Sequence, residues 1–186
     1  MFAKINNMYE TERLILRKWQ DSDLQPFAAM GQDPLVMEHF LGLLSFDESR
    51  AMIERIKARF DKYGFSFFAC ELKQSADFIG FVGLNVSSYE AHFTPSVEIG
   101  WRIASNHWGK GYATEAALKC LDIGFNELKL NEIVSIAVKD NLKSQHVMRK
   151  IGMHQDINGS FLHPNFAPDH PLALHVLYRI KAKGYE

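Results

Sequence analysis

The sequence predicts a mixed α+β protein, in which helices flank a mostly antiparallel central sheet that contains one parallel βαβ unit. Segments 65–72, 78–86 and 97–103 are short apolar strand patterns, and the polar turn KQSAD joins the first two. An amphipathic helix pattern covers 112–128, and the apolar, β-branched run EIVSIAVK follows at 132–139. Because a strand–helix–strand crossover makes its two strands parallel, 97–103 and 132–139 form the parallel pair.

The N-terminal third predicts one strand and two helices. ERLILRKW, residues 12–19, alternates apolar and polar residues as a short strand does. SDLQ (22–25) and SFDE (45–48) both carry the capping-box pattern, a serine followed three residues later by Gln or Glu. We expect the first helix to end near Gly31 and the second near Gly64.

The C-terminal third predicts a helix and a hairpin. NLKSQHVMRKIG, residues 141–152, is a short helix pattern with Gly152 at the position after the helix end. Segments 154–162 and 172–180 form a hairpin-like pair around a proline-rich loop. A chain of 186 residues with no long linker fits one domain, 1–186.

Composition limits the partners and the compartment. The net charge of −1 gives no general field for nucleic acid. No apolar run reaches the roughly 18 residues that a membrane span needs, and the first residues carry no secretory pattern. Cys70 and Cys120 are far apart in sequence and outside any C-x-x-C pair, as is typical of buried thiols in a cytoplasmic protein. The oligomeric state, monomer or dimer, stays open.

HWGKGYATEA, residues 107–116, has the chemistry of an anion site. Gly109 and Gly111 expose backbone directly before a helix, whose first N–H groups lack internal partners and carry about half a positive charge. A Walker loop is excluded, because Gly111 follows Lys110 where Ser or Thr is required. Thr114 stands at the last position of a Rossmann fingerprint, which needs Gly or Ala there.

A third pattern fits this stretch. WGKGYATEA, after EIGW and before VKDNLKSQHVMRKIGM, resembles the GNAT superfamily of acetyl-CoA-dependent N-acetyltransferases, whose pyrophosphate loop reads [QR]-x-x-G-x-[GA]. Trp108, Gly111 and Ala113 occupy these positions, with Trp in place of Gln or Arg. WGKGYATEA and an opening like ETERLILR are similar to the RimJ/RimL branch, named for ribosomal-protein N-terminal acetyltransferases. The resemblance covers about 10–180 and implies the GNAT fold and acetyl-CoA as cofactor.

The resemblance also implies a binding mode. Strand 132–139 splays from strand 97–103, and the pantetheine arm of the cofactor enters the opening, where a backbone N–H stabilises the oxyanion. The implied cofactor contacts are Trp101, Arg102, Ile103, Trp108, Gly109, Lys110, Gly111, Tyr112, Ala113, Thr114, Asn141 and Ser144. Lys110 is a minor contact in this scheme, because its side chain could equally be a solvated loop lysine that binds no phosphate.

Glu98 is the candidate general base. Strand alternation places Glu98, Gly100 and Arg102 on one face, and we expect Gly100 to leave an open spot for substrate beside Glu98. The resemblance implies a glutamate on this strand that removes the amine proton, frequently through water. An exposed glutamate paired with a nearby cation is the structural alternative.

Ser144 is the candidate proton donor to the leaving thiolate. Asn141 fits both a helix N-cap and a cofactor contact. Many relatives carry a Tyr seven positions after that Asn, but this chain has Met148 there, which cannot donate a proton. By resemblance to the RimJ/RimL branch the role passes to Ser144, for which a plain surface serine is the alternative.

Three functions remain open from the sequence. By resemblance the leading acceptor is the α-amine at the N-terminus of a protein. That this protein is ribosomal rests on the family analogy only. A small-molecule acceptor, such as a polyamine, aminoglycoside or amino-acid-like amine, uses the same cofactor half, and a non-catalytic acetyl-CoA-binding module is the third. His163, His170 and His175 match no zinc spacing, so we expect no metal site.

Overall fold

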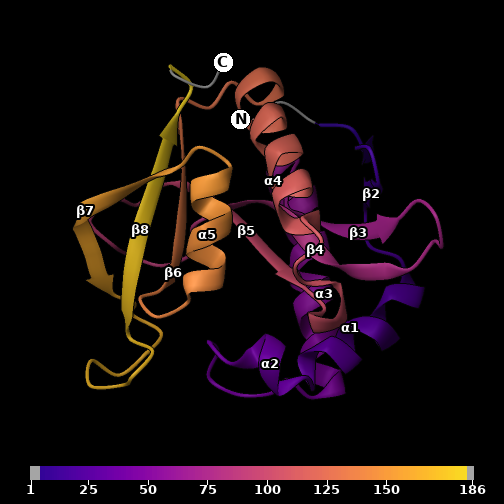
Figure 1. The fold of residues 1–186 in the computed structure, drawn as a ribbon, viewed down its shortest axis with the longest axis horizontal. Helices are drawn as coiled ribbons and strands as arrows, with labels where there is room; N and C mark the ends of the chain where they lie inside the picture. Colours follow the sequence, from indigo (N-terminus) through magenta and orange to yellow (C-terminus); the bar gives the residue numbers. More distant parts are fainter. Residues whose placement is uncertain (1–4, 184–186) are drawn as a thin grey trace.

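An eight-stranded mixed sheet runs through residues 5–183, the part of the chain that the computed structural model describes (Figure 1). The strands are β1 (Met8–Glu10), β2 (Leu14–Arg17), β3 (Phe67–Leu72), β4 (Phe78–Val86), β5 (Val97–Ile103), β6 (Glu132–Val138), β7 (His154–Leu162) and β8 (Leu174–Lys181). Their order in the sheet is β1-β2-β3-β4-β5-β6-β8-β7. Within these residues β5 and β6 pair in parallel and every other pair is antiparallel, which confirms the predicted fold class.

Helices connect and cover the strands. They are α1 (Leu24–Gly31), α2 (Pro34–Met37), α3 (Phe46–Tyr63), α4 (Tyr112–Asp122) and α5 (Leu142–Lys150), with 3₁₀ turns at Asp21–Asp23 and Ser105–His107 and a π-helical turn at Ile123–Glu127. The helix predicted over 112–128 is therefore α4 followed by the π-helical turn. β1 and α2 were not predicted, because each is too short to show a hydrophobic period.

The two predicted capping boxes have different outcomes. At Ser45 the prediction is confirmed: its hydroxyl accepts the Glu48 N–H, and the Glu48 carboxylate accepts the Ser45 N–H at 2.7 Å. At 22–25 it is wrong, because Asp23 rather than Gln25 closes the turn by accepting the backbone N–H of Gln20. Asp23 is fixed there by two hydrogen bonds from the buried guanidinium of Arg17.

Different helices cover the two faces of the sheet. On one face, Phe27 of α1 packs among the rings of Trp19, Phe78 and Phe81. On the other face, the segment that continues α4 packs so closely that a Cβ on Gly124 would lie 2.5 Å from Ile133 of β6. This close packing holds the π-helical turn after α4 against β6.

The parallel pair is short. Glu98 and Val134 are the residues that β5 and β6 pair in register, although β5 pairs with β4 and β6 with β8 along their whole lengths. The hydroxyl of Ser135 donates to the Ile99 carbonyl and closes the pair there. Beyond this point the carboxyl-terminal half of β5 pairs with no strand on its β6 side among residues 5–183, so the predicted splay is present.

The C-terminal hairpin buries two histidines. β7 and β8 pair antiparallel as predicted, and the rings of His163 and His175 lie 4.9 Å apart between centroids, close to the ring of Tyr89. Among the described residues no group of three or more potential ligands is arranged to hold a metal ion. Cys70 and Cys120 are buried free thiols, and no described helix has the length and apolarity to cross a bilayer.

Acidification should destabilise this hairpin. Burial, together with the charge of neighbouring His175, lowers the pKa of His163 from 6.5 to about 4. The unfolded chain therefore binds a proton at pH values where the folded chain does not, so stability falls as the pH drops from 6.5 to 4.

The melting temperature of wild type, measured from pH 7 to pH 4, should therefore drop more than that of His163→Phe. His154→Gln, a change at an exposed histidine, is the control and should follow wild type. Parallel curves for all three proteins would contradict the assignment of this pH dependence to His163.

Candidate active site

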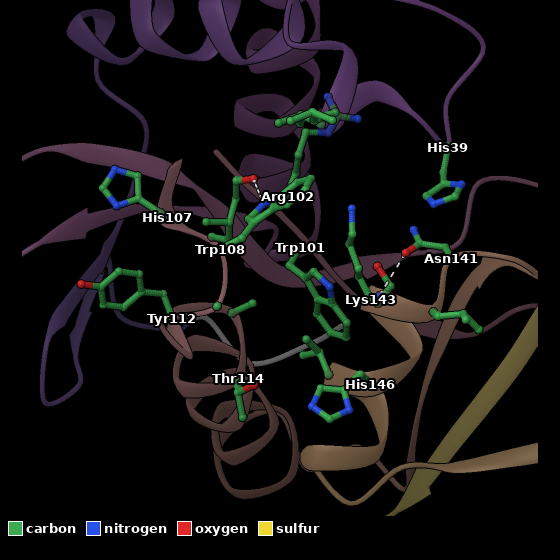
Figure 2. A pocket seen from close by; sticks show the side chains of 18 of the residues that line it. His39, Trp101, Arg102, His107, Trp108, Tyr112, Thr114, Asn141, Lys143 and His146 are labelled. Atoms are coloured by element: carbon green, nitrogen blue, oxygen red, sulfur yellow. Dashed lines mark hydrogen bonds between the residues drawn. The ribbon is translucent and has the colours of Figure 1, made fainter. Parts of the chain in front are cut away.

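A cavity of about 680 Å³ opens where β5 and β6 separate (Figure 2). Four segments form its walls: the 35–40 segment after α1, the end of β5, the loop into α4, and one face of α5. The predicted residues that line it are Trp101, Arg102, Ile103, Trp108, Gly109, Gly111, Tyr112, Ala113, Thr114, Asn141 and Ser144. Of the predicted site residues, Glu98 and Lys110 do not line it.

The glycine loop leads directly into α4. Gly109 and Gly111 have φ angles of 75° and 83°, which favour glycine, and Gly111 is the residue on which α4 begins. A Cβ built on Gly109 would meet no atom within 4 Å, so the backbone there is open to a ligand. Tyr112, Ala113 and Thr114 of the first helical turn line the cavity, and the N–H groups at a helix start suit a pyrophosphate.

Thr11 and Arg13, in the turn between β1 and β2, hold this loop by hydrogen bonds, and we call the pair the clamp. Arg13 donates one hydrogen bond to the Lys110 carbonyl at 2.9 Å and another to the Glu115 carboxylate at 2.7 Å. The Thr11 hydroxyl donates to the same carboxylate. Burial raises the pKa of Glu115, but these hydrogen bonds outweigh it and hold the pKa below its ordinary value. Lys110 thus contributes its carbonyl to the clamp and is not a wall residue.

Trp108, which stands where the loop pattern has Gln or Arg, anchors the loop to the sheet through its indole N–H. Its indole N–H donates to the Ile103 carbonyl at 2.7 Å, which ties the loop to the end of β5 (Figure 2). The ammonium of Lys143 lies 4.5 Å from the centroid of the Trp108 ring. The Ile103 carbonyl is therefore already an acceptor within the chain.

Asn141 and Ser144 form the start of α5. The side-chain oxygen of Asn141 accepts the Ser144 N–H at 3.0 Å, which confirms the predicted N-cap (Figure 2). This bond caps the start of α5, and both residues line the cavity. Met148, by contrast, is 1% exposed and belongs to the core, so no donor is lost from the cavity at that position.

Glu98 lies behind the cavity wall. The open spot expected at Gly100 is absent, because a Cβ there would lie 3.2 Å from the Phe67 ring, which fills the space. The Glu98 Oε1 is buried and forms no hydrogen bond of standard geometry among the described residues. Burial and the adjacent negative charge of Glu98 raise the pKa of the Tyr89 phenol.

Arg102 is the buried cation of the site. It is 8% exposed, lines the cavity, and lies with its guanidinium 4.1 Å from the centroid of the Phe40 ring and 5.5 Å from that of Phe81. Figure 2 shows Arg102 and Trp101 on opposite sides of β5, with Trp101 pointing toward α4 and α5. Burial lowers the pKa of Arg102 to about 10.

Sequence reasoning missed two parts of the wall. On α5, Lys143, His146 and Lys150 recur at helical spacing and place positive charge beside the loop, a pattern that the sequence does contain. The other part, residues 35–40, showed no motif. His107, before the loop, also lines the cavity, and burial together with the charge of Lys110 lowers its pKa.

Comparison with known proteins establishes the family. Residues 13–154 match the family described as the acetyltransferase (GNAT) domain. YkkB, an uncharacterized protein of Bacillus subtilis, is 35% identical over 145 residues, which is 77% of this chain and 83% of YkkB. The uncharacterized N-acetyltransferase p20 of Bacillus licheniformis is 30% identical over 149 residues, 78% of this chain and 82% of p20.

Solved structures agree. The crystal structure of a GNAT-family acetyltransferase from Bacillus anthracis has a TM-score of 0.76 and 26% identity, over 95% of this chain and 99% of that one. The chain therefore belongs to the GNAT family and is an acetyl-CoA-dependent N-acetyltransferase.

Gly109→Ala should weaken acetyl-CoA binding. A left-handed conformation costs alanine roughly 1–2 kcal/mol, so the loop leaves its open shape and affinity falls by about tenfold. Isothermal titration with acetyl-CoA measures this change.

Gly42→Ala is the matched control, because a Cβ at Gly42 meets no atom within 4 Å, its φ lies outside the left-handed region, and it does not line the cavity. Wild-type affinity in Gly109→Ala would show that the loop backbone does not hold the cofactor.

Proposed function

We propose that this enzyme transfers the acetyl group of acetyl-CoA to the α-amine at the N-terminus of a protein or peptide, by direct attack. The observation that carries the proposal is one continuous cavity that joins the glycine loop before α4 to an exposed apolar segment after α1. Leu35 and Phe40 of that segment line the cavity and are 60% and 41% exposed. A chain end of an acceptor fits such an open apolar wall.

The residues fit the cofactor. The loop backbone from Gly109 to Thr114 is open to a pyrophosphate, and Lys143 and Lys150 add positive charge beside it. The unpaired edge of β5 from Trp101 offers backbone groups to the pantetheine arm. When bound, acetyl-CoA supplies the acetyl group as an activated thioester.

Two proton transfers remain for the chain. Glu98, a buried carboxylate beside the Tyr89 phenol, is our candidate base and takes the amine proton through a bridging water. Ser144, on the cavity wall, is our candidate donor to the leaving thiolate. An α-amine has a pKa near 8, against about 10.4 for lysine, so a modest base suffices.

Charge on the cavity wall favours this acceptor over a polyamine. Glu38 is the lining carboxylate among the described residues, and it is 3.7 Å from the Lys143 ammonium and 3.8 Å from the His39 ring nitrogen. A polycation needs several free carboxylates to bind.

Assignment to the RimJ/RimL branch rests on the WGKGYATEA and ETERLILR motifs. The two free thiols fit a cytoplasmic enzyme.

Thiol release from acetyl-CoA tests the proposal. The acceptors are peptides that differ in their first residue, each also with a blocked N-terminus, together with free lysine, spermidine and an aminoglycoside. We expect release with free α-amine peptides that stops when the N-terminus is blocked. Release with spermidine or the aminoglycoside alone would move the enzyme to the small-molecule class.

Ser144→Ala should lower kcat with the best acceptor and leave the affinity for acetyl-CoA unchanged, since proton transfer in the transition state contributes roughly 10²-fold or more. Glu98→Gln should likewise lower kcat. Ser22→Ala, a change at an exposed serine, is the control. An unchanged kcat in either site variant removes that residue from the mechanism.

A further inference from the structure

Arg102 carries a buried positive charge that the described part of the chain leaves without a polar partner. Its Nε and Nη1 atoms are buried and make no hydrogen bond. Burial is the cause of its lowered pKa, and no neighbouring carboxylate opposes it. Because a buried ion without a partner is costly, such a group in a cavity wall indicates an anionic ligand.

The surroundings of Arg102 select the shape of that ligand. The rings of Phe40 and Phe81 lie against the guanidinium and supply cation–π contact, but a ring accepts no in-plane hydrogen bond. The N–H groups in the plane of the guanidinium therefore stay available for hydrogen bonds. Two such N–H groups on one edge match the two oxygens of a carboxylate.

The position of Arg102 assigns this ligand to the acceptor side of the cavity. Arg102 pairs with Phe81 of β4 and extends toward the segment that carries Phe40, whereas Trp101 points the other way, toward α4 and α5 (Figure 2). The glycine loop and the α5 lysines, which suit the cofactor phosphates, come from the α4–α5 side.

We propose that Arg102 binds a carboxylate of the acceptor, so that the preferred substrate is an α-amine with a carboxylate beside it. This inference rests on the proposed function, in which the acceptor enters past residues 35–40. Two sources supply the same chemistry: the acidic side chain of a peptide's first residue, and the α-carboxylate of a free amino acid.

Matched acceptors separate the two sources. One pair is a peptide amide that begins with Glu and its Gln counterpart, and the other is alanine and alaninamide. In the wild-type enzyme, thiol release should show kcat/KM at least about tenfold higher for the carboxylate member of one pair. No preference in either pair would overturn the inference.

Variants of Arg102 locate the effect. Arg102→Gln should bring that ratio close to one by raising KM for the acceptor, with KM for acetyl-CoA unchanged, and Arg102→Lys should keep part of the preference. Arg55→Met, a change at an exposed arginine of α3 outside the cavity wall, should behave as wild type. An equal loss for both members of a pair, or a raised KM for acetyl-CoA, would assign Arg102 to the cofactor or to the fold.

Thermal stability separates binding from a structural role. Because the charge is uncompensated in the free protein, Arg102→Met should melt at the wild-type temperature or above. A lower melting temperature would show that the arginine holds the two rings together instead.

A binding measurement keeps the inference testable if no α-amine turns over, a result that would defeat the proposed function alone. N-acetylglutamate is titrated into the protein with CoA present, and the fluorescence of Trp101 and Trp108 in the cavity wall reports binding. A signal in wild type that is lost in Arg102→Gln supports the carboxylate site. Equal signals, or none in wild type, overturn it.

Discussion

The short contact between β5 and β6 is the constraint on which the site depends. The two strands pair at Glu98 and Val134, and each then follows its antiparallel neighbour. The antiparallel pairings hold the strands apart, because β5 cannot leave β4, nor β6 leave β8, without losing a full ladder of hydrogen bonds. The opening is thus a consequence of the sheet topology, and it leaves strand edge and helix starts facing one cavity.

Residues far apart in sequence hold the cofactor loop in its open shape. Thr11 and Arg13 bond to Glu115, and Arg13 also bonds to the Lys110 carbonyl, so the turn between β1 and β2 is tied to the first turn of α4. This gives a physical reason for the joint presence of ETERLILR and WGKGYATEA in one chain. WGKGYATEA supplies the backbone of the loop, and ETERLILR supplies the Thr11 and Arg13 side chains that hold it.

Local patterns predicted the fold well, and most of the residues proposed to bind the cofactor line one cavity. Alternation, helical spacing and capping located the main elements, and the glycines before α4 marked a loop that lines the cavity. Three-dimensional contacts decided the rest. Alternation placed Gly100 beside Glu98, but only the packed structure shows that the Phe67 ring fills that space. Likewise the family resemblance placed Arg102 among the cofactor contacts, and only the folded structure shows that Phe40, from a segment without a motif, lies over its guanidinium.

The most direct test of the whole account is a crystal structure with a bisubstrate analogue, in which CoA is joined through an acetyl bridge to the α-amine of a short peptide. We expect the pyrophosphate on the backbone of residues 109–114, the pantetheine arm between β5 and β6, and the peptide leaving past Leu35 and Phe40. An analogue bound outside this opening, or a peptide that leaves on the α4–α5 side, would contradict it.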